Sequence, residues 1–178
     1  VRNSILLWGD SSENQTSLVW EWNSLAWHAS PFDSAPESVT DAAYAYDENR
    51  KQTMRFGGVK NGQAVAETWI WDGTQWNFPS PTVSPSPRYG HAMAYDAQRH
   101  FTVLFGGIRS DGGILNDTWI FDGSSWSAIA SPISPNARSH SAMFYDPTRQ
   151  KVVLFGGKSS TDVFGDLWEW DGTTRSEI

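Results

Sequence analysis

The chain has 178 residues, of which 39% are hydrophobic and 19% charged, a balance that excludes an intrinsically disordered chain. No run approaches the about 18 apolar residues of a membrane-spanning helix, and a net charge of −7 argues against nucleic acid or an anionic membrane surface as the main partner. The absence of cysteine excludes disulfides, thiolate zinc sites and cysteine nucleophiles.

In chain order, the first predicted element is an apolar run over residues 5–10, which matches the second strand of the repeating unit described below. The double glycine that starts at Gly57 returns at Gly106 and Gly156, at steps of 49 and 50 residues. Other markers keep the same steps, namely Tyr46, Tyr95 and Tyr145, and Trp20, Trp69, Trp119 and Trp168. Independent markers with one period indicate internal repeats of about 50 residues.

Residues 88–129 form one complete unit and show what each repeat contains. Residues 92–95 alternate small and large side chains with the period of two expected of a strand. An apolar run over 101–105 predicts a second strand that ends on the double glycine, and residues 117–121 predict a third. Asp122-Gly123 is a hairpin signal, and Trp126 lies on a fourth strand. Four short antiparallel strands in about 50 residues are typical of one β-propeller blade.

The same residues resemble the kelch motif, a double glycine followed by spaced aromatic residues. Residues 88–96, 103–107 and 117–126 carry the motif in full, and three near-complete copies and one partial copy cover almost the whole chain. The resemblance implies an all-β, kelch-type β-propeller of about 3.5 to 4 four-stranded blades. The expected blades are residues 1–29 (partial), 39–79, 88–129 and 138–178. The last strand of the fourth blade is left open, because Arg175 stands where Trp76 and Trp126 stand.

So few blades fall short of the usual closed ring. Three explanations stay open: the chain is a fragment of a longer propeller, two or more copies associate, or the four blades close alone. Two copies would supply about eight blades, which lies within the usual range, so a homodimer is expected. Arg55 and Trp8 are candidate subunit contacts. Arg55 stands in an otherwise apolar strand, so we expect its side chain either to be exposed to solvent at an edge of the propeller or to be paired with a carboxylate.

Candidate binding residues lie in the loops between second and third strands, residues 10–17, 59–66, 108–116 and 158–165. These loops vary while the flanking strands repeat, which is typical of adaptable loops on a rigid scaffold. Their charged residues are candidate ligand contacts, against the alternative of solvated loops: Arg109, Asp111, Lys158 and Asp162, with Asp166 nearby. The acidic residues lack the dense spacing of a calcium loop.

Arg88 and Arg138 each begin an innermost strand, seven residues before the repeated tyrosine. This position lies near the mouth of the central channel of a propeller, where a guanidinium group can bind a ligand carboxylate through two hydrogen bonds. The resemblance implies such a role, because kelch domains that bind acidic peptides use arginines of the channel in this way. The alternative is a structural pairing with a neighbouring loop, and Val39 leaves the set incomplete in the first full repeat. His91 and His140 differ by one position in their spacing from the repeated tyrosines, so their side chains should point to opposite faces of the strands. A metal site shared by the two histidines is therefore not expected. His91 is a ligand contact or a structural histidine.

These patterns favour a non-catalytic kelch-type binding or scaffold module that uses its loop face. The sequence shows no catalytic motif, set of metal ligands or cofactor site. Kelch-like copper oxidases depend on a tyrosine cross-linked to a cysteine, so their chemistry is not expected in a chain without cysteine. The alternative is part of a carbohydrate-active bacterial protein similar to kelch-like sugar isomerases or hydrolases. The partner is then a protein, a peptide or a glycan. Trp-Asp-Gly turns, Ser/Thr-rich loops and the lack of cysteine favour a secreted or cell-surface bacterial protein.

Overall fold

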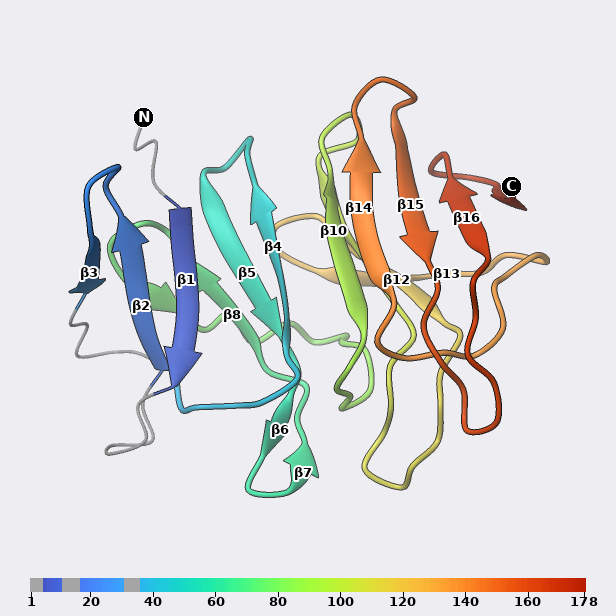
Figure 1. Cartoon of the computed structure of the whole chain (residues 1–178), viewed down its shortest axis with the longest axis horizontal. Helices are drawn as coiled ribbons and strands as arrows, with labels where there is room; N and C mark the ends of the chain where they lie inside the picture. The colour runs from blue at the N-terminus through green and yellow to red at the C-terminus, as the bar shows by residue number, and fades with distance from the viewer. Residues whose placement is uncertain (1–4, 11–16, 31–35) are drawn as a thin grey trace.

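The computed structural model describes residues 5–10, 17–30 and 36–178, and every regular element in these ranges is a strand. The strands form four antiparallel sheets in which sequence neighbours pair, here numbered 1 to 4 along the chain (Figure 1). This confirms the predicted all-β architecture. Sheet 1 contains β1 (Ile5–Asp10), β2 (Ser17–Trp22) and β3 (Trp27–Ser30); sheet 2 contains β4 (Ala43–Asp47), β5 (Gln52–Phe56), β8 (Thr68–Trp71) and β9 (Trp76–Asn77).

Sheets 3 and 4 repeat the arrangement of sheet 2. Sheet 3 contains β10 (Ala92–Asp96), β11 (Phe101–Phe105), β12 (Thr118–Phe121) and β13 (Trp126–Ile129), and sheet 4 contains β14 (Ala142–Asp146), β15 (Lys151–Phe155), β16 (Leu167–Trp170) and β17 (Arg175–Glu177). A small hairpin of β6 (Val59–Lys60) and β7 (Gln63–Ala64) stands in the loop between β5 and β8.

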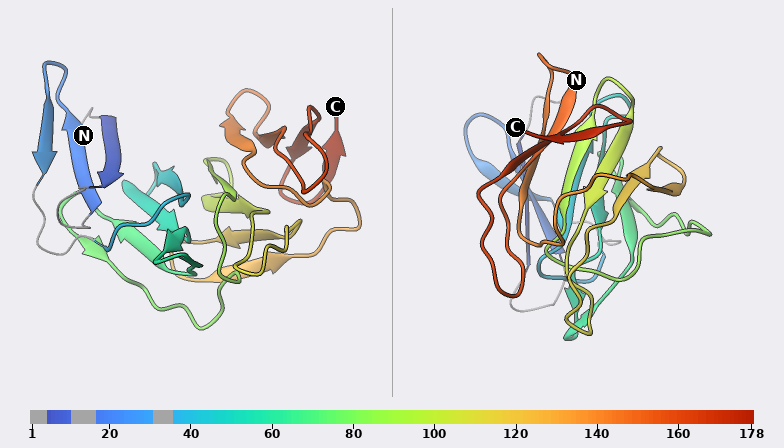
Figure 2. Two further views of the ribbon diagram at one scale, coloured as in Figure 1. Left: turned by 60° about the horizontal axis from the view of Figure 1, so that its bottom comes forward. Right: turned by 90° about the vertical axis from the view of Figure 1, so that its right-hand side faces the viewer.

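The four sheets lie side by side in an open arc, with sheets 1 and 4 at its opposite ends (Figure 2). The innermost strands hold the arc together, since β4 contacts β10 and β10 contacts β14. Closure of the four sheets into a ring by themselves is therefore not observed.

The hydrophobic core lies between successive sheets. Phe56 of sheet 2 packs with Met93, Leu104 and Trp126 of sheet 3, and its ring centroid lies 5.0 Å from that of Trp126. Alternate residues of each strand point to opposite faces, so sheet 3 packs one face on sheet 2 and the other on sheet 4.

The double glycines permit a close approach between the backbones of neighbouring sheets. Gly58 N–H donates to the carbonyl of Arg88 at 2.9 Å, and Gly107 N–H donates to the carbonyl of Arg138 at 3.0 Å. A Cβ on Gly57 or on Gly106 would lie 2.5 Å from the same two carbonyl oxygens. Any side chain at these positions would force the sheets apart.

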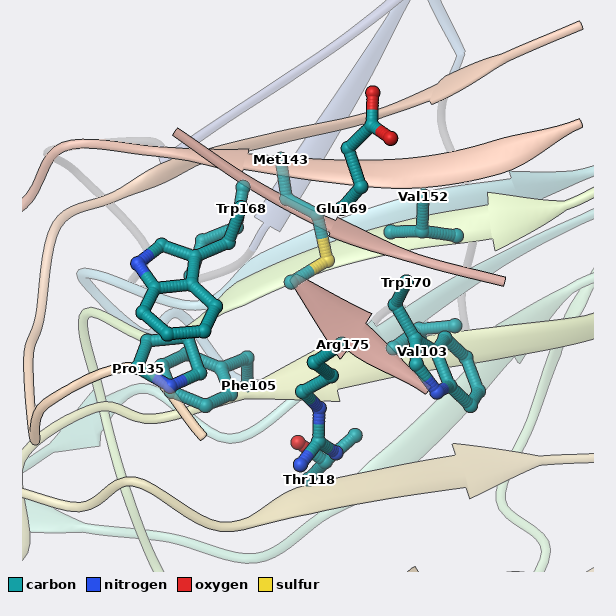
Figure 3. A pocket seen from close by; sticks show the side chains of 11 residues that line it. Val103, Phe105, Thr118, Pro135, Met143, Val152, Trp168, Glu169, Trp170 and Arg175 are labelled. Carbon is teal, nitrogen blue, oxygen red and sulfur yellow. The ribbon is translucent and has the colours of Figure 1, made fainter. Parts of the chain in front are cut away.

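The fourth strand of sheet 4, left open by the sequence, is present as β17, and Arg175 pairs with Trp170. Trp126 fills the equivalent place in sheet 3, where its Nε1 donates to Thr68 Oγ1 of sheet 2 at 3.0 Å. Arg175 instead points toward Thr118 of sheet 3 (Figure 3). Within the described part of the chain, Thr118 Oγ1 has no hydrogen-bond partner.

A cavity of about 30 Å³ remains between sheets 3 and 4 at this point, and burial lowers the pKa of the Arg175 guanidinium. The volume exceeds the roughly 10–15 Å³ that one water molecule requires. The interface between sheets 3 and 4 is therefore incompletely filled beside Arg175.

We predict that Arg175→Trp stabilises the protein by about 1–2 kcal/mol, because the indole fills the cavity and its Nε1 donates to Thr118. Urea unfolding followed by circular dichroism measures the change. The reciprocal control, Trp126→Arg, should destabilise the protein. A variant Arg175→Trp that is no more stable than the parent would contradict this account.

Candidate functional site

Three loops of different sequence project from one end of sheets 2 to 4, which we call the loop end (Figure 1). They span residues 59–66, 108–116 and 158–165 and join the second and third strands of their sheets. The first two loops touch, since Ala64 N–H donates to Ser110 Oγ at 2.8 Å.

An arginine–aspartate clasp holds the base of the loop in sheet 3. Arg88 is fully buried, and its Nη1 and Nη2 donate to the two oxygens of Asp117 at 2.6 and 2.7 Å. Nη1 also donates to the carbonyl of Gly106 at 2.9 Å, and Trp119 Nε1 donates to Asp117 at 2.7 Å. Burial alone would raise the pKa of Asp117, but the hydrogen bond and charge of Arg88 lower it overall.

Sheet 4 repeats the clasp. Arg138 Nη1 and Nη2 donate to Asp166 at 2.5 and 2.7 Å, and Trp168 Nε1 donates to the same carboxylate at 2.7 Å. The guanidinium also lies 4.1 Å from the centroid of the Phe164 ring, a cation–π contact. The hydrogen bond from Arg138 lowers the pKa of Asp166, so the clasp is an ion pair at neutral pH.

Sheet 2 builds the clasp from a different strand, because Val39 occupies the arginine position. Arg55 of β5 takes over the role, with its Nη2 3.8 Å from Glu67 Oε2. Its Nη1 donates to the carbonyl of Glu37 at 3.2 Å. Trp69 Nε1 donates to Glu67 at 2.9 Å, as the equivalent tryptophans do in sheets 3 and 4.

The carbonyl that Arg55 meets also has equivalents in the other clasps. Glu37 lies two residues before Val39, and Arg88 Nε and Arg138 Nε donate to the carbonyls two residues before them, at 3.0 Å each. The guanidinium of Arg55 thus has the same two kinds of partner as those of Arg88 and Arg138. In sheet 2 the arginine lies on the second strand and the aliphatic residue, Val39, precedes the innermost strand. In sheet 3 these two positions are reversed, with Arg88 before the innermost strand and Leu104 on the second strand.

The buried arginines named from the sequence therefore face the protein's own acceptors. Arg88 and Arg138 make the structural pairing that was the alternative to ligand binding. Arg55 makes the carboxylate pairing and is fully buried, which leaves none of its side chain exposed for a subunit contact. The side chain of Trp8 lies outside the described part of the chain, and its backbone pairs with Val19.

The two histidines occupy different surroundings. His91 is buried with its ring centroid 5.5 Å from that of Phe56, edge to face, and burial together with the nearby Arg88 charge lowers its pKa to about 3. His140 is exposed, and its Nδ1 lies 3.0 Å from Ser139 Oγ. Across the described residues, no three His, Cys, Asp or Glu side chains gather as a potential metal site.

The remaining predicted residues are exposed in the loops, and of these Lys158 lies at the base of its loop, where its backbone pairs with that of Ser139. Arg109 Nη2 and Asp111 Oδ2 are 3.0 Å apart, and the backbone N–H of Gly113 lowers the pKa of Asp111. Lys158 is exposed, and Asp162 closes a turn by accepting from Thr161 Oγ1 at 2.6 Å. The structure therefore brings Arg109 and Asp111 together and places Lys158 and Asp162 on the next loop.

One polar cluster at the loop end was missed by the sequence reasoning. Lys60 Nζ lies 3.0 Å from Glu37 and 3.4 Å from Glu67, beside a hollow of about 290 Å³ lined by residues 37–40 and 59–62. A repeated feature of the sequence could have indicated this cluster: an acidic residue stands two positions before the tryptophan of the third strand in each full repeat, namely Glu67, Asp117 and Asp166.

The model of the KLHDC2/KLHL20/DRC7 Kelch-repeats domain matches residues 1–176 of the chain. No curated protein matches it. In the ranges that the structure describes, no helix is long and apolar enough to cross a membrane.

The exchange between Val39 and Arg55 predicts strong coupling in stability. Arg55→Leu should cost about 2–3 kcal/mol, because Glu67 loses its guanidinium, and Val39→Arg alone should also destabilise. The double variant restores the arrangement of sheets 3 and 4 and should recover about 2 kcal/mol relative to additivity. Urea unfolding of the four proteins measures the coupling. Additive losses would show that the two positions do not share one site.

The buried His91 predicts a pH-dependent stability. Its pKa is about 3 in the folded chain and near 6.5 in the unfolded chain, so only the unfolded state binds the proton between these values. Stability should fall as the pH drops from 6.5 toward 3, by up to about 1.4 kcal/mol per pH unit from this group. In urea titrations at pH 6 and 4.5, His91→Gln should flatten that slope. An unchanged slope would assign the effect to other groups.

Proposed function

Because the chain belongs to the kelch-repeat family, whose domains generally mediate protein binding, we propose that it is a non-catalytic binding module. Its ligand is a protein, and its contact surface is the loop end. The observation that carries the proposal is the contrast between loop bases and loop tips. The bases are repeated and locked by the clasps of Arg88 and Arg138, whereas the tips differ and are exposed. Rigid support with variable tips suits selective recognition.

The opposite end of the sheets lacks this contrast. Its turns repeat one ion pair, with distances of 2.7 Å for Asp47–Arg50, 2.8 Å for Asp96–Arg99 and 2.8 Å for Asp146–Arg149. Arg99 also reaches the carbonyl of Gln150 in the next sheet at 3.1 Å. The repetition and the links between sheets indicate a structural role, which leaves the loop end as the variable surface.

The loop tips offer polar contacts of both signs. Arg109 pairs with Asp111 on one loop, the next loop carries Lys158 and Asp162, both exposed, and Val163 on that loop is 88% exposed. Mixed charges around an exposed apolar side chain suit the polar rim and small apolar centre of a protein interface.

Selection from a random peptide library against the immobilised chain tests the proposal. Selected peptides should bind the parent and lose about tenfold in affinity, or about 1.4 kcal/mol, with Arg109→Ala/Asp111→Ala and with Lys158→Ala/Asp162→Ala. The matched control, Lys51→Ala/Gln150→Ala, changes exposed residues at the opposite end and should bind normally.

Two results would overturn the proposal. Peptides that bind the loop variants as tightly as the parent would move the contact surface elsewhere. A glycan array that shows saturable binding, with no peptide selected, would favour the carbohydrate-binding alternative.

Self-association is part of the proposal. The open arc leaves a face of sheet 4 uncovered (Figure 2), and large exposed apolar surface is characteristic of interaction sites. We propose that copies of the chain associate.

A further inference from the structure

The three loops of the loop end are supported in different ways, and we call them the first, second and third loops, residues 59–66, 108–116 and 158–165. The first loop consists mainly of the hairpin of β6 and β7, whose strands have two residues each. A hairpin of two strands is marginal by itself. Its β6 side is tied to sheet 2, because Val59 N–H donates to the carbonyl of Thr40 at 2.8 Å. The position of β7 therefore depends on what lies along its other side.

Ala64 provides a backbone donor on that other side of β7. Val65 N–H donates to the carbonyl of Gly58 at 3.0 Å. Successive N–H groups of an antiparallel strand point to opposite sides, so Ala64 N–H points away from β6. It donates to Ser110 Oγ of the second loop at 2.8 Å. The hydroxyl of Ser110 thus supplies the acceptor that a further strand would otherwise supply.

Ser110 is itself held in place by the turn that carries it. Arg109 N–H donates to the carbonyl of Gly113, and Gly112 N–H donates to the carbonyl of Arg109, both at 2.9 Å. The side chain of Asp111 closes the turn, since its Oδ1 accepts from Gly113 N–H at 2.9 Å and from Arg109 Nε at 3.2 Å. The donor of the first loop therefore meets an acceptor whose backbone is already fixed.

The third loop is not joined to the second loop in this way. Among the residues that the structure describes, no hydrogen bond connects these two loops. The third loop closes on itself, because Ser159 Oγ accepts from Asp162 N–H at 2.9 Å and from Thr161 N–H at 3.2 Å. The hydroxyl of Ser159 thus stabilises its own turn, whereas the hydroxyl of Ser110 contacts the neighbouring loop.

The position of the hairpin also sets the shape of the hollow beside Lys60. Residues 59–62 of the hairpin form one wall of the hollow, and residues 37–40 form the other. Lys60 Nζ lies 3.0 Å from a carboxylate oxygen of Glu37 on the opposite wall. Because Ser110 contacts β7, on the side of the hairpin away from β6, it fixes the hairpin wall relative to the second loop.

We infer that Ser110 is a positioning residue that joins the first and second loops into one contact unit for the protein ligand. The inference rests on the proposed function and specifies which part of the loop end acts together. Loops that are fixed relative to each other before binding have less freedom to lose when the ligand binds. The hairpin and the turn of Ser110 therefore meet a ligand as one surface, and the third loop contributes separately.

Amide hydrogen exchange of Ala64, followed by NMR in the chain without ligand, tests the contact between the two loops. Ser110→Ala should speed this exchange several-fold, because the N–H loses its acceptor. Ser110→Thr keeps a hydroxyl and should restore the protection. The matched control, Ser159→Ala, removes a serine from the turn of the third loop and should leave the exchange of Ala64 unchanged. Exchange at Ala64 that is equally slow in Ser110→Ala and in the parent would overturn the inference.

Peptides selected against the parent chain test the role of Ser110 in binding. They should depend on both loops, losing affinity with Gln63→Ala and with Arg109→Ala/Asp111→Ala. The same peptides should bind Ser110→Ala about three- to tenfold more weakly and Ser110→Thr as tightly as the parent.

The outcomes separate this inference from the proposed function. Peptides that bind Ser110→Ala as tightly as the parent, or that depend on only one of the two loops, would overturn the inference and keep the loop end as the binding surface. If no peptide binds the parent chain, the proposed function fails and the inference fails with it.

Discussion

The rest of the structure depends on the close approach between the double glycines and the next innermost strand. The carbonyl of Arg88 lies 2.5 Å from where a Cβ of Gly57 would be, and the same carbonyl accepts from Gly58 N–H. The guanidinium of Arg88 meanwhile clasps Asp117 at the base of its own loop. One residue therefore sets the spacing to the preceding sheet through its backbone and fixes a loop through its side chain. Because this unit repeats, the sheets and the loop bases form one rigid framework.

That framework explains why the loops can vary. The stability of a repeat array is close to a sum of repeat and neighbour terms, and here the neighbour terms come from glycine contacts and buried apolar side chains. The side chains of Arg109, Asp111, Lys158 and Asp162 contribute little to either, since they are exposed in the loops. These positions can therefore change without loss of the fold, which is the physical basis for the proposal that the loop end binds a ligand.

The sequence predicts the sheets well because their markers are local and periodic. Glycine pairs, alternating strands and Asp-Gly turns need no knowledge of tertiary contacts. The sequence left two alternatives for Arg55, a solvent-exposed edge or a carboxylate partner, and could not name the partner. Glu67 becomes identifiable only when the register places Arg55 opposite Trp69, beside Glu67. The fourth strand of sheet 4 was left open for a similar reason. Arg175 lacks the aromatic marker, yet backbone pairing with β16 forms the strand anyway.

Sheet 4 differs from sheets 2 and 3 at positions on both of its faces. Toward sheet 3, Arg175 stands where the earlier sheets have a tryptophan, and a cavity remains beside it. On the other face, Phe144 and Glu169 stand where the earlier sheets have alanine and isoleucine. Because the stability of a repeat array depends on the contacts between neighbouring repeats, these replacements change what sheet 4 contributes to the array, whereas the backbone pairing of its four strands stays the same.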